Sequence, residues 1–90
     1  MNFTKKELQD ISRENADKWV EKTFDKSYIQ DLILMAVEKG KESLILYCTG
    51  YEEELLRKNA LLIRRHLENV FPDLDIKIST GLGLVTISWE

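Results

Sequence analysis

The chain has 90 residues, with 13 Lys and Arg against 16 Asp and Glu, so its net charge is −3. A chain of this length supports one domain and has little room for a deep enzyme cleft. The mildly acidic balance disfavours a dedicated nucleic-acid binder, because affinity for phosphates comes largely from clustered cations. With 43% hydrophobic residues, one Pro and four Gly, the composition is that of a globular protein with a core.

The sequence lacks the common signals for cofactors, metals and membranes. Cys48 and His66 are the single cysteine and histidine, so neither an internal disulfide nor a structural zinc site is expected, and a reducing cytoplasm is favoured. The longest apolar run, Leu32–Val37, is far shorter than the roughly 20 residues of a membrane span, and no signal peptide is read at the start. We expect no cofactor, no metal and no catalytic residue.

Three helices are predicted from a repeated start signal, a Ser or Thr followed three residues later by Glu or Gln. The signal occurs at Thr4/Glu7, Ser27/Gln30 and Thr49/Glu52. Apolar residues at helical spacing then extend the predicted helices over 4–22, 28–39 and 51–70. The apolar arc of the second helix reaches almost all the way round, so we expect it to be covered on more than one side.

Three segments carry strand patterns. Residues 43–48 are apolar at consecutive positions, which is typical of a strand partly covered on both faces. Residues 74–79 and 84–89 alternate apolar and polar side chains around a turn. The order α-α-β-α-β-β predicts an α+β fold with a three-stranded mixed sheet, a β-α-β crossover plus a C-terminal hairpin, packed against helices. We treat the chain as a single domain, 1–90, with a peripheral first helix and a compact core: 1–26 and 27–90.

Two polar residues of the third predicted helix, Asn59 and His66, fall near the centre of its apolar arc. A buried amide or imidazole costs about 1–3 kcal/mol if unpaired, so we expect a hydrogen bond to a strand carbonyl, to Tyr47, or between the two through water. A subunit interface or a ligand pocket on this face stays open as an alternative. A nucleophile and base pair of Cys48 and His66 is disfavoured, because no third group or oxyanion donor is recognisable.

The same helix carries the one local concentration of cations in an acidic chain. These residues are Arg57, Lys58, Arg64 and Arg65. Glu53, Glu54 and Glu68 lie within one or two turns of them, which favours a solvated face with i,i+4 ion pairs. Contact with nucleic-acid phosphates is the alternative interpretation.

The apolar surface exceeds what three short strands can cover. Whichever way strand 43–48 is turned, one of its apolar sets faces away from the helices, and Leu84 lies on the corresponding side of the last strand. Contiguous exposed apolar area usually marks an interface. With the large anchor of the first helix added, the candidate interface comprises Trp19, Ile45, Tyr47 and Leu84.

Two segments give a resemblance in architecture. Residues Ala36–Glu42, where a helix ends in Gly before a strand, and Leu84–Trp89, the closing strand, resemble small bacteriophage-encoded proteins of unknown role. The resemblance covers about residues 28–90 and brings no catalytic or binding residue. It implies a small accessory protein in the host cytoplasm that acts on a host or phage protein by binding.

These features favour a non-enzymatic binding or assembly module that works through protein–protein contacts, as a homodimer, using a sheet face or the first helix. A membrane or nucleic-acid partner is not expected. A nucleic-acid-associated protein using Arg57, Arg64 and Arg65 is the alternative, and a small enzyme built on Cys48 and His66 is the second.

Overall fold

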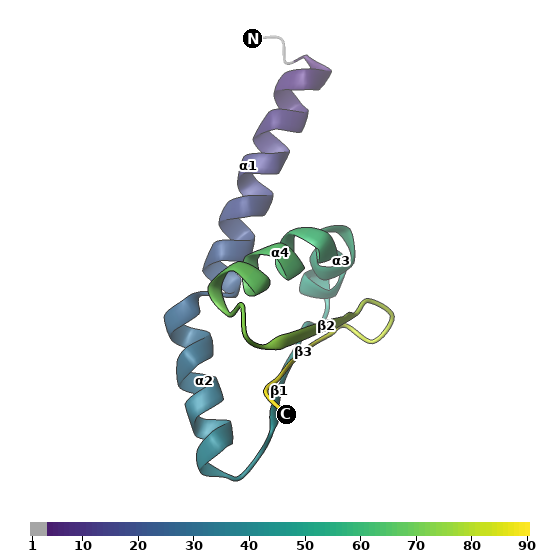
Figure 1. Ribbon diagram of the computed structural model, residues 1–90. Helices are drawn as coiled ribbons and strands as arrows, with labels where there is room; N and C mark the ends of the chain where they lie inside the picture. The colour runs from purple at the N-terminus through teal and green to yellow at the C-terminus, as the bar shows by residue number, and fades with distance from the viewer. Residues whose placement is uncertain (1–3) are drawn as a thin grey trace.

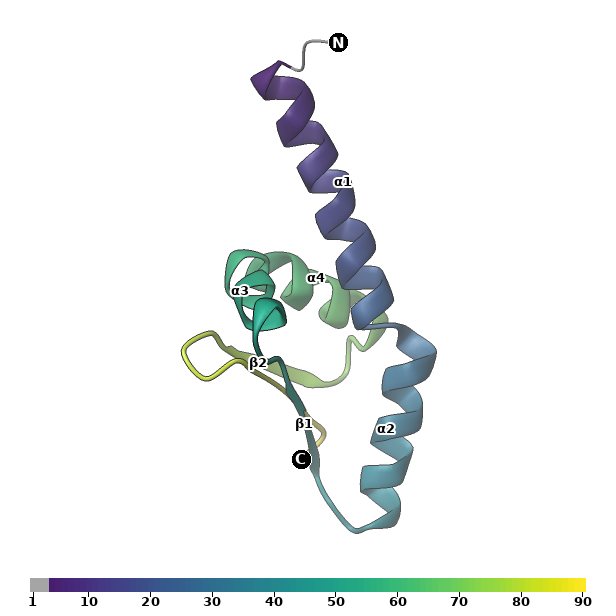
Figure 2. The same cartoon turned by 180° about the vertical axis from the view of Figure 1, so that it is seen from behind.

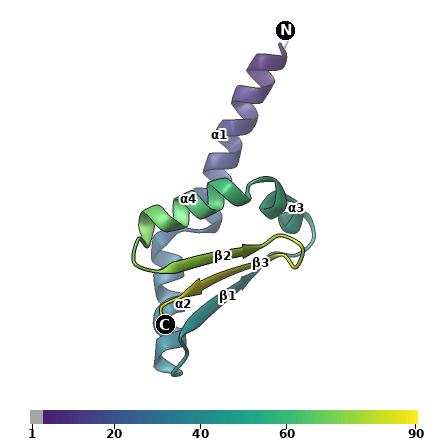
Figure 3. The ribbon, with the colours of Figure 1, turned by 45° about the vertical axis from the view of Figure 1, so that its right-hand side comes forward.

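The computed structural model describes residues 4–90, which form four helices and three strands (Figure 1). In chain order these are α1 (Lys5–Thr23), α2 (Lys26–Glu38), β1 (Ser43–Tyr47), α3 (Tyr51–Lys58), α4 (Ala60–Val70), β2 (Asp75–Ser79) and β3 (Leu84–Ser88). Helix α4 packs against β2 and α2 packs against β1, while α1 projects away from this body (Figure 3). The α+β class predicted from the sequence is confirmed.

The helices begin for different reasons. At α1 the predicted capping box is present: the Thr4 hydroxyl accepts from the Glu7 amide at 3.1 Å, and the Glu7 carboxylate accepts from the Thr4 amide at 3.4 Å. Helix α2 instead begins after Asp25, whose carboxylate accepts from the Tyr28 amide at 3.1 Å. Helix α3 follows Gly50 and has no side-chain cap. Only the first of the three start signals therefore builds the predicted cap.

The single helix predicted over 51–70 is wrong, because the chain breaks at Asn59 into α3 and α4. The backbone of Asn59 leaves the helical region, with φ −112° and ψ 20°. Its backbone amide and its side-chain Nδ2 both donate to the Leu55 carbonyl, at 2.9 and 3.0 Å. Asn side chains compete with the backbone for hydrogen bonds in this way, which disfavours them inside helices.

The predicted mixed sheet is also wrong, because all pairing in the sheet is antiparallel. The strand order is β1-β3-β2, so the last strand lies between the first two. Val85 and Ile87 of β3 are completely buried, which suits a central strand. Lys77 of β2 is exposed, as is typical of an edge strand. The connection from β1 to β2 therefore crosses over β3, which lies between these two strands.

The core lies between the helices and one face of the sheet. Two rows of apolar side chains cross this inner face, one through Ile87 and one through Val85. The rows are Leu44–Ile87–Ile76 and Leu46–Val85–Ile78. The helices cover them with completely buried side chains, notably Ile29, Leu56, Ile63 and Leu67.

Gly83 joins the β2–β3 turn to the end of β1. Its φ is +66°, which non-glycine residues rarely adopt, and its carbonyl accepts from the Cys48 amide at 2.8 Å. A Cβ at this position would lie 2.6 Å from the Cys48 carbonyl oxygen. The turn therefore requires glycine for two independent reasons.

Helix α1 leaves the body of the molecule. Residues 5–15 are all exposed, and the principal extents of the chain are 55 × 24 × 17 Å. The Cα radius of gyration is 14.9 Å, against about 12 Å for a compact chain of this length.

Helix α2 is covered on one side only, whereas the sequence predicted cover on more than one side. Its exposed apolar residues are Tyr28, Leu34, Met35 and Val37. Within residues 4–90 no helix has the length and apolar character required to cross a bilayer.

Ile63→Ala tests the importance of the inner layer. Ile63 of α4 is completely buried, so its truncation leaves a cavity and is expected to lower the free energy of unfolding by about 2–5 kcal/mol. Urea denaturation measures the change, and Ile63→Val, expected at about 0.5–1.5 kcal/mol, serves if the alanine variant fails to fold. Leu61→Ala on the exposed side of the same helix is the control, expected within about 0.5 kcal/mol of the unmodified chain. Equal effects at the two positions would contradict the packing described.

Candidate functional site

One face of α1 carries a stripe that contains its two exposed apolar residues, Leu8 and Ile11, together with Ser12, Asn15 and Trp19. On a wheel of about 100° per residue, Leu8, Ser12, Asn15 and Trp19 fall within about 60°, and Ile11 borders them. Leu8 and Ile11 are 49% and 44% exposed. Asp10 and Asp17 lie on the opposite side of the helix. We call Leu8, Ile11, Ser12, Asn15 and Trp19 the α1 stripe.

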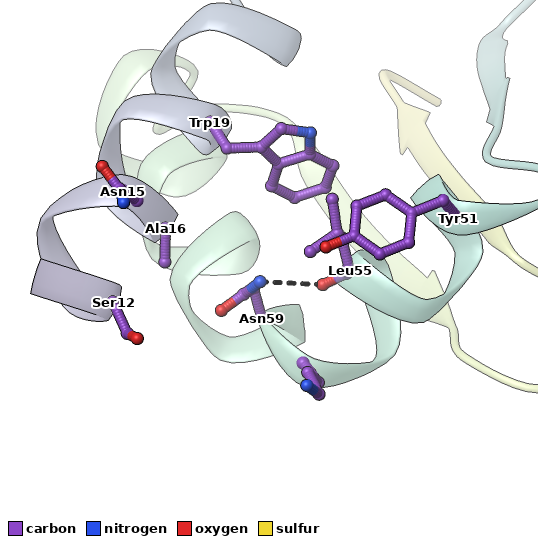
Figure 4. Close-up of a pocket in the computed structure, with 8 residues that line it drawn as sticks. Ser12, Asn15, Ala16, Trp19, Tyr51, Leu55 and Asn59 are labelled. Carbon is purple, nitrogen blue, oxygen red and sulfur yellow. Dashed lines mark hydrogen bonds between the residues drawn. The ribbon is translucent and has the colours of Figure 1, made fainter. Parts of the chain in front are cut away.

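The α1 stripe continues into a hollow between α1 and α3, which we call the α1–α3 groove. Its volume is about 410 Å³, and it is lined by Ser12, Asn15, Ala16, Trp19, Tyr51, Leu55, Lys58 and Asn59. In Figure 4, Trp19 of α1 and Tyr51 of α3 extend toward each other near Leu55, and Asn59 lies beside them. The groove thus has an aromatic and aliphatic part, with Trp19, Tyr51 and Leu55, and polar residues around it.

Trp19 is the fixed part of this groove. Its indole ring meets the ring of Phe24 edge to face, with centroids 6.0 Å apart and an interplanar angle of 88°. Phe24 itself is buried. Tyr51, by contrast, is 73% exposed, so a bound segment would remove most of its surface from water. Sequence reasoning missed Tyr51, Leu55 and Ser12, although the wheel of the first helix already places Ser12 beside Leu8 and Trp19.

The four residues of the predicted interface do not lie together. Ile45, Tyr47 and Leu84 share the outer face of the sheet, where Tyr47 and Leu84 are direct cross-strand partners. Ile45 is 43% and Tyr47 is 69% exposed, and Leu84 is half-buried. Trp19 lines the α1–α3 groove on the helix side instead. The predicted interface is therefore divided between two surfaces.

Asn59 and His66 are half-buried, and each has its own acceptor. The His66 Nε2 lies 2.7 Å from the Phe24 carbonyl oxygen, which can only accept, so Nε2 carries the hydrogen. This bond joins α4 to the end of α1. Asn59 donates within its own helix pair, to Leu55. Neither acceptor is the strand carbonyl or the Tyr47 side chain that the sequence led us to expect, and both bonds hold the fold together.

Two of the four predicted phosphate-contact residues, Arg57 and Arg64, form ion pairs with carboxylates. Arg57 contacts Glu53 at 3.4 Å and Arg64 contacts Glu68 at 3.9 Å, both as exposed i,i+4 pairs. The break at Asn59 also distributes Arg57 and Lys58 on α3 and Arg64 and Arg65 on α4. Such pairs are worth little stability, but they offset the positive charge that a phosphate backbone would need. The geometry therefore favours a solvent-exposed face with ion pairs over a surface that binds phosphates.

Cys48 lies in an environment that suppresses its reactivity. The thiol is buried, and burial, followed by the negative charge of Glu52, raises its pKa above the ordinary value of 9.0. The thiolate is the reactive form, so a raised pKa disfavours nucleophilic chemistry. The His66 ring is bound to the Phe24 carbonyl, and residues 4–90 hold no cluster of three His, Cys, Asp or Glu side chains suited to a metal ion. Nothing here supports a catalytic pair.

Comparisons with known protein families, with curated proteins and with solved structures give no match to this chain. The resemblance to bacteriophage-encoded proteins therefore stays a prediction.

The raised pKa of Cys48 predicts a pH dependence of stability. Above pH 9.0 the unfolded chain releases the thiol proton while the folded chain keeps it, so the free energy of unfolding falls as pH rises through the folded pKa. Below pH 9.0 the contribution is fully present. Urea midpoints measured on either side of this pH should therefore fall more steeply for the unmodified chain than for Cys48→Ala. Identical slopes would show that the thiol is not desolvated.

His66→Leu tests the bond between α4 and the end of α1. The variant removes the donor and leaves the carbonyl of the buried Phe24 without it, so we expect a loss of about 1–2 kcal/mol in the free energy of unfolding. Arg65→Ala, exposed on the same helix, is the control and should change stability by less than about 0.5 kcal/mol. A loss for His66→Leu no larger than the control's would mean that the bond contributes nothing.

Proposed function

We propose that this chain is a small non-enzymatic module that binds another protein, and that the partner lays an amphipathic helix along the α1 stripe and into the α1–α3 groove. The exposure of residues 5–15 carries the proposal. An isolated helix of this length is marginal in water, because nucleation is costly and most helix stability comes from packing of an apolar face. A partner that covers Leu8 and Ile11 supplies that packing.

The groove supports a helical partner in particular. A helix recognised in a groove presents apolar anchors at i, i+3 or i+4, and i+7, and Leu8 with Ile11 provides an exposed apolar i, i+3 pair for such anchors to contact. The space of about 410 Å³ beside Trp19 and Tyr51 accepts large apolar anchors. Aromatic residues of this kind dominate binding energy at interfaces. Such a module fits the phage-encoded accessory role that the sequence resemblance implies, with the host cytoplasm as its place of action.

Site-specific photo-crosslinking tests the proposal in the cells from which the chain comes. A photoreactive residue at Leu8 or at Ile11 should capture the same protein, whereas the same residue at Asp10 or Asp17, on the opposite side of α1, should not. Equal capture from both sides, or none from either, would contradict the proposal. The captured protein, identified by mass spectrometry, then becomes the ligand for direct binding measurements.

Tyr51→Ala measures how much the α1–α3 groove contributes to the affinity for the partner. Because Tyr51 is largely exposed, its truncation should leave the urea midpoint unchanged while weakening the captured partner's binding by about tenfold or more. Leu82→Ala, equally exposed at 73% but in the β2–β3 turn, is the matched control and should bind normally. Equal affinities of the two variants would remove the groove from the binding site.

A further inference from the structure

The two edges of the sheet differ in how they are protected. The β2 edge carries exposed charges, Asp75 and Lys77, and charged side chains are a common protection against strand-to-strand association. The β1 edge is the sequence Ser-Leu-Ile-Leu-Tyr, with no charge, no Pro and no bulge in its pairing with β3. Figure 2 shows β1 running along the border of the sheet, from α2 toward α3. The β2 edge is therefore protected by charge against pairing with another strand, and the β1 edge is not.

The backbone of β1 is oriented for pairing on its free side. The Cys48 amide donates to Gly83 at 2.8 Å, and the Glu42 carbonyl accepts from Trp89 at 3.0 Å, so even-numbered residues point toward β3. Antiparallel pairing alternates from residue to residue. The N–H and C=O groups of Ser43, Ile45 and Tyr47 therefore point away from β3, toward the open edge.

A hollow of about 430 Å³ runs beside this edge. Ile45 to Cys48 form one wall, and Thr23, Phe24 and Tyr28 at the α1–α2 junction form the other. Tyr28 begins a row on α2 at i, i+4 and i+7, with Leu32 and Met35, and Tyr28 and Met35 are more than half exposed. The opposite flank of α2, with Ile33 and Leu34, adjoins Phe71 and Leu74. The exposed row thus lies on the same side of the molecule as the open β1 edge.

We propose that a second copy of this chain occupies that side, with the two β1 strands paired antiparallel about a two-fold axis to make one continuous six-stranded sheet. An axis normal to the sheet keeps both α2 helices on the same face, where their Tyr28 rows meet. Charge also fits: antiparallel pairing brings Lys41, before β1, toward Glu52 of the second copy, which follows β1 and borders the hollow. Between these ends the five residues of β1 carry no charge, and the exposed Glu42 stands directly before them, beside Lys41.

This self-association is separate from the binding of another protein at α1. Sedimentation velocity of the full chain should show a dimer, and Ile45→Lys, which puts a charge at the middle of the edge, should weaken it by about tenfold or more. Ser79→Lys adds the same charge to the β2 edge and should leave the dimer intact. A monomer at the highest soluble concentration, or a dimer equally stable in both variants, would overturn the proposal. Leu8→Ser should change partner capture and leave the dimer unchanged, so the two proposals fail independently.

Amide hydrogen exchange on the unmodified chain tests the geometry without any substitution. Leu44 and Leu46 amides should be protected at every concentration, because they bond to β3. Ile45 and Tyr47 amides should gain protection only as the dimer forms. If these two amides exchange freely in the dimer, β1 does not make the contact and the proposal is wrong. This measurement also decides the matter if Ile45→Lys does not fold.

Discussion

The structure depends on the apolar layer that the central strand forms with its two neighbours. Val85 and Ile87 are completely buried, and each lies between an apolar residue of β1 and one of β2. The helices bury this layer, and within residues 4–90 no further helix or strand covers the other face. Because strand side chains alternate between faces, every residue between the layer's members is left outside. The exposure of Ile45 and Tyr47 thus follows from the alternation of the strand and the cover of the sheet on one face.

Phe24 determines how α1 leaves the body. Its side chain is buried in the core, its ring meets Trp19, and its carbonyl accepts from His66. These contacts lie at the last turn of α1, where Val20 is the one buried residue of the helix. Contacts confined to one end fix the direction of a helix but do not cover its length. The projection of α1 and the existence of the α1–α3 groove have this common origin.

The sequence predicted the features that follow from the periodicity of apolar residues. It did not predict the features that depend on contacts between distant segments. Alternation in 74–79 and 84–89 predicted these two strands. For strand 43–48 the sequence left open which apolar set faces outward, and the structure places Ile45 and Tyr47 there, beside Leu84. Strand order stayed open, and the mixed sheet was wrongly predicted, because a β-α-β pattern fixes the relative direction of two strands and does not say which strand lies between them. The break at Asn59 was missed because its polar side chain was interpreted as facing the core, when it bonds its own helix at Leu55. The α1–α3 groove is formed by two distant segments, which no local pattern brings together.

The two uncovered surfaces approach each other at the Trp19–Phe24 pair and on α3, where Tyr51 lines the groove and Glu52 borders the hollow. Trp19 lines the α1–α3 groove, and Phe24, against which it packs, lines the hollow beside β1. Through this pair, a change at one surface could reach the other by moving Phe24. Its side chain is buried in a close-packed core, which resists small displacements, and its carbonyl is held by His66 at 2.7 Å. We therefore expect the two surfaces to be occupied independently, so that a dimer presents two equivalent α1 helices to its partners.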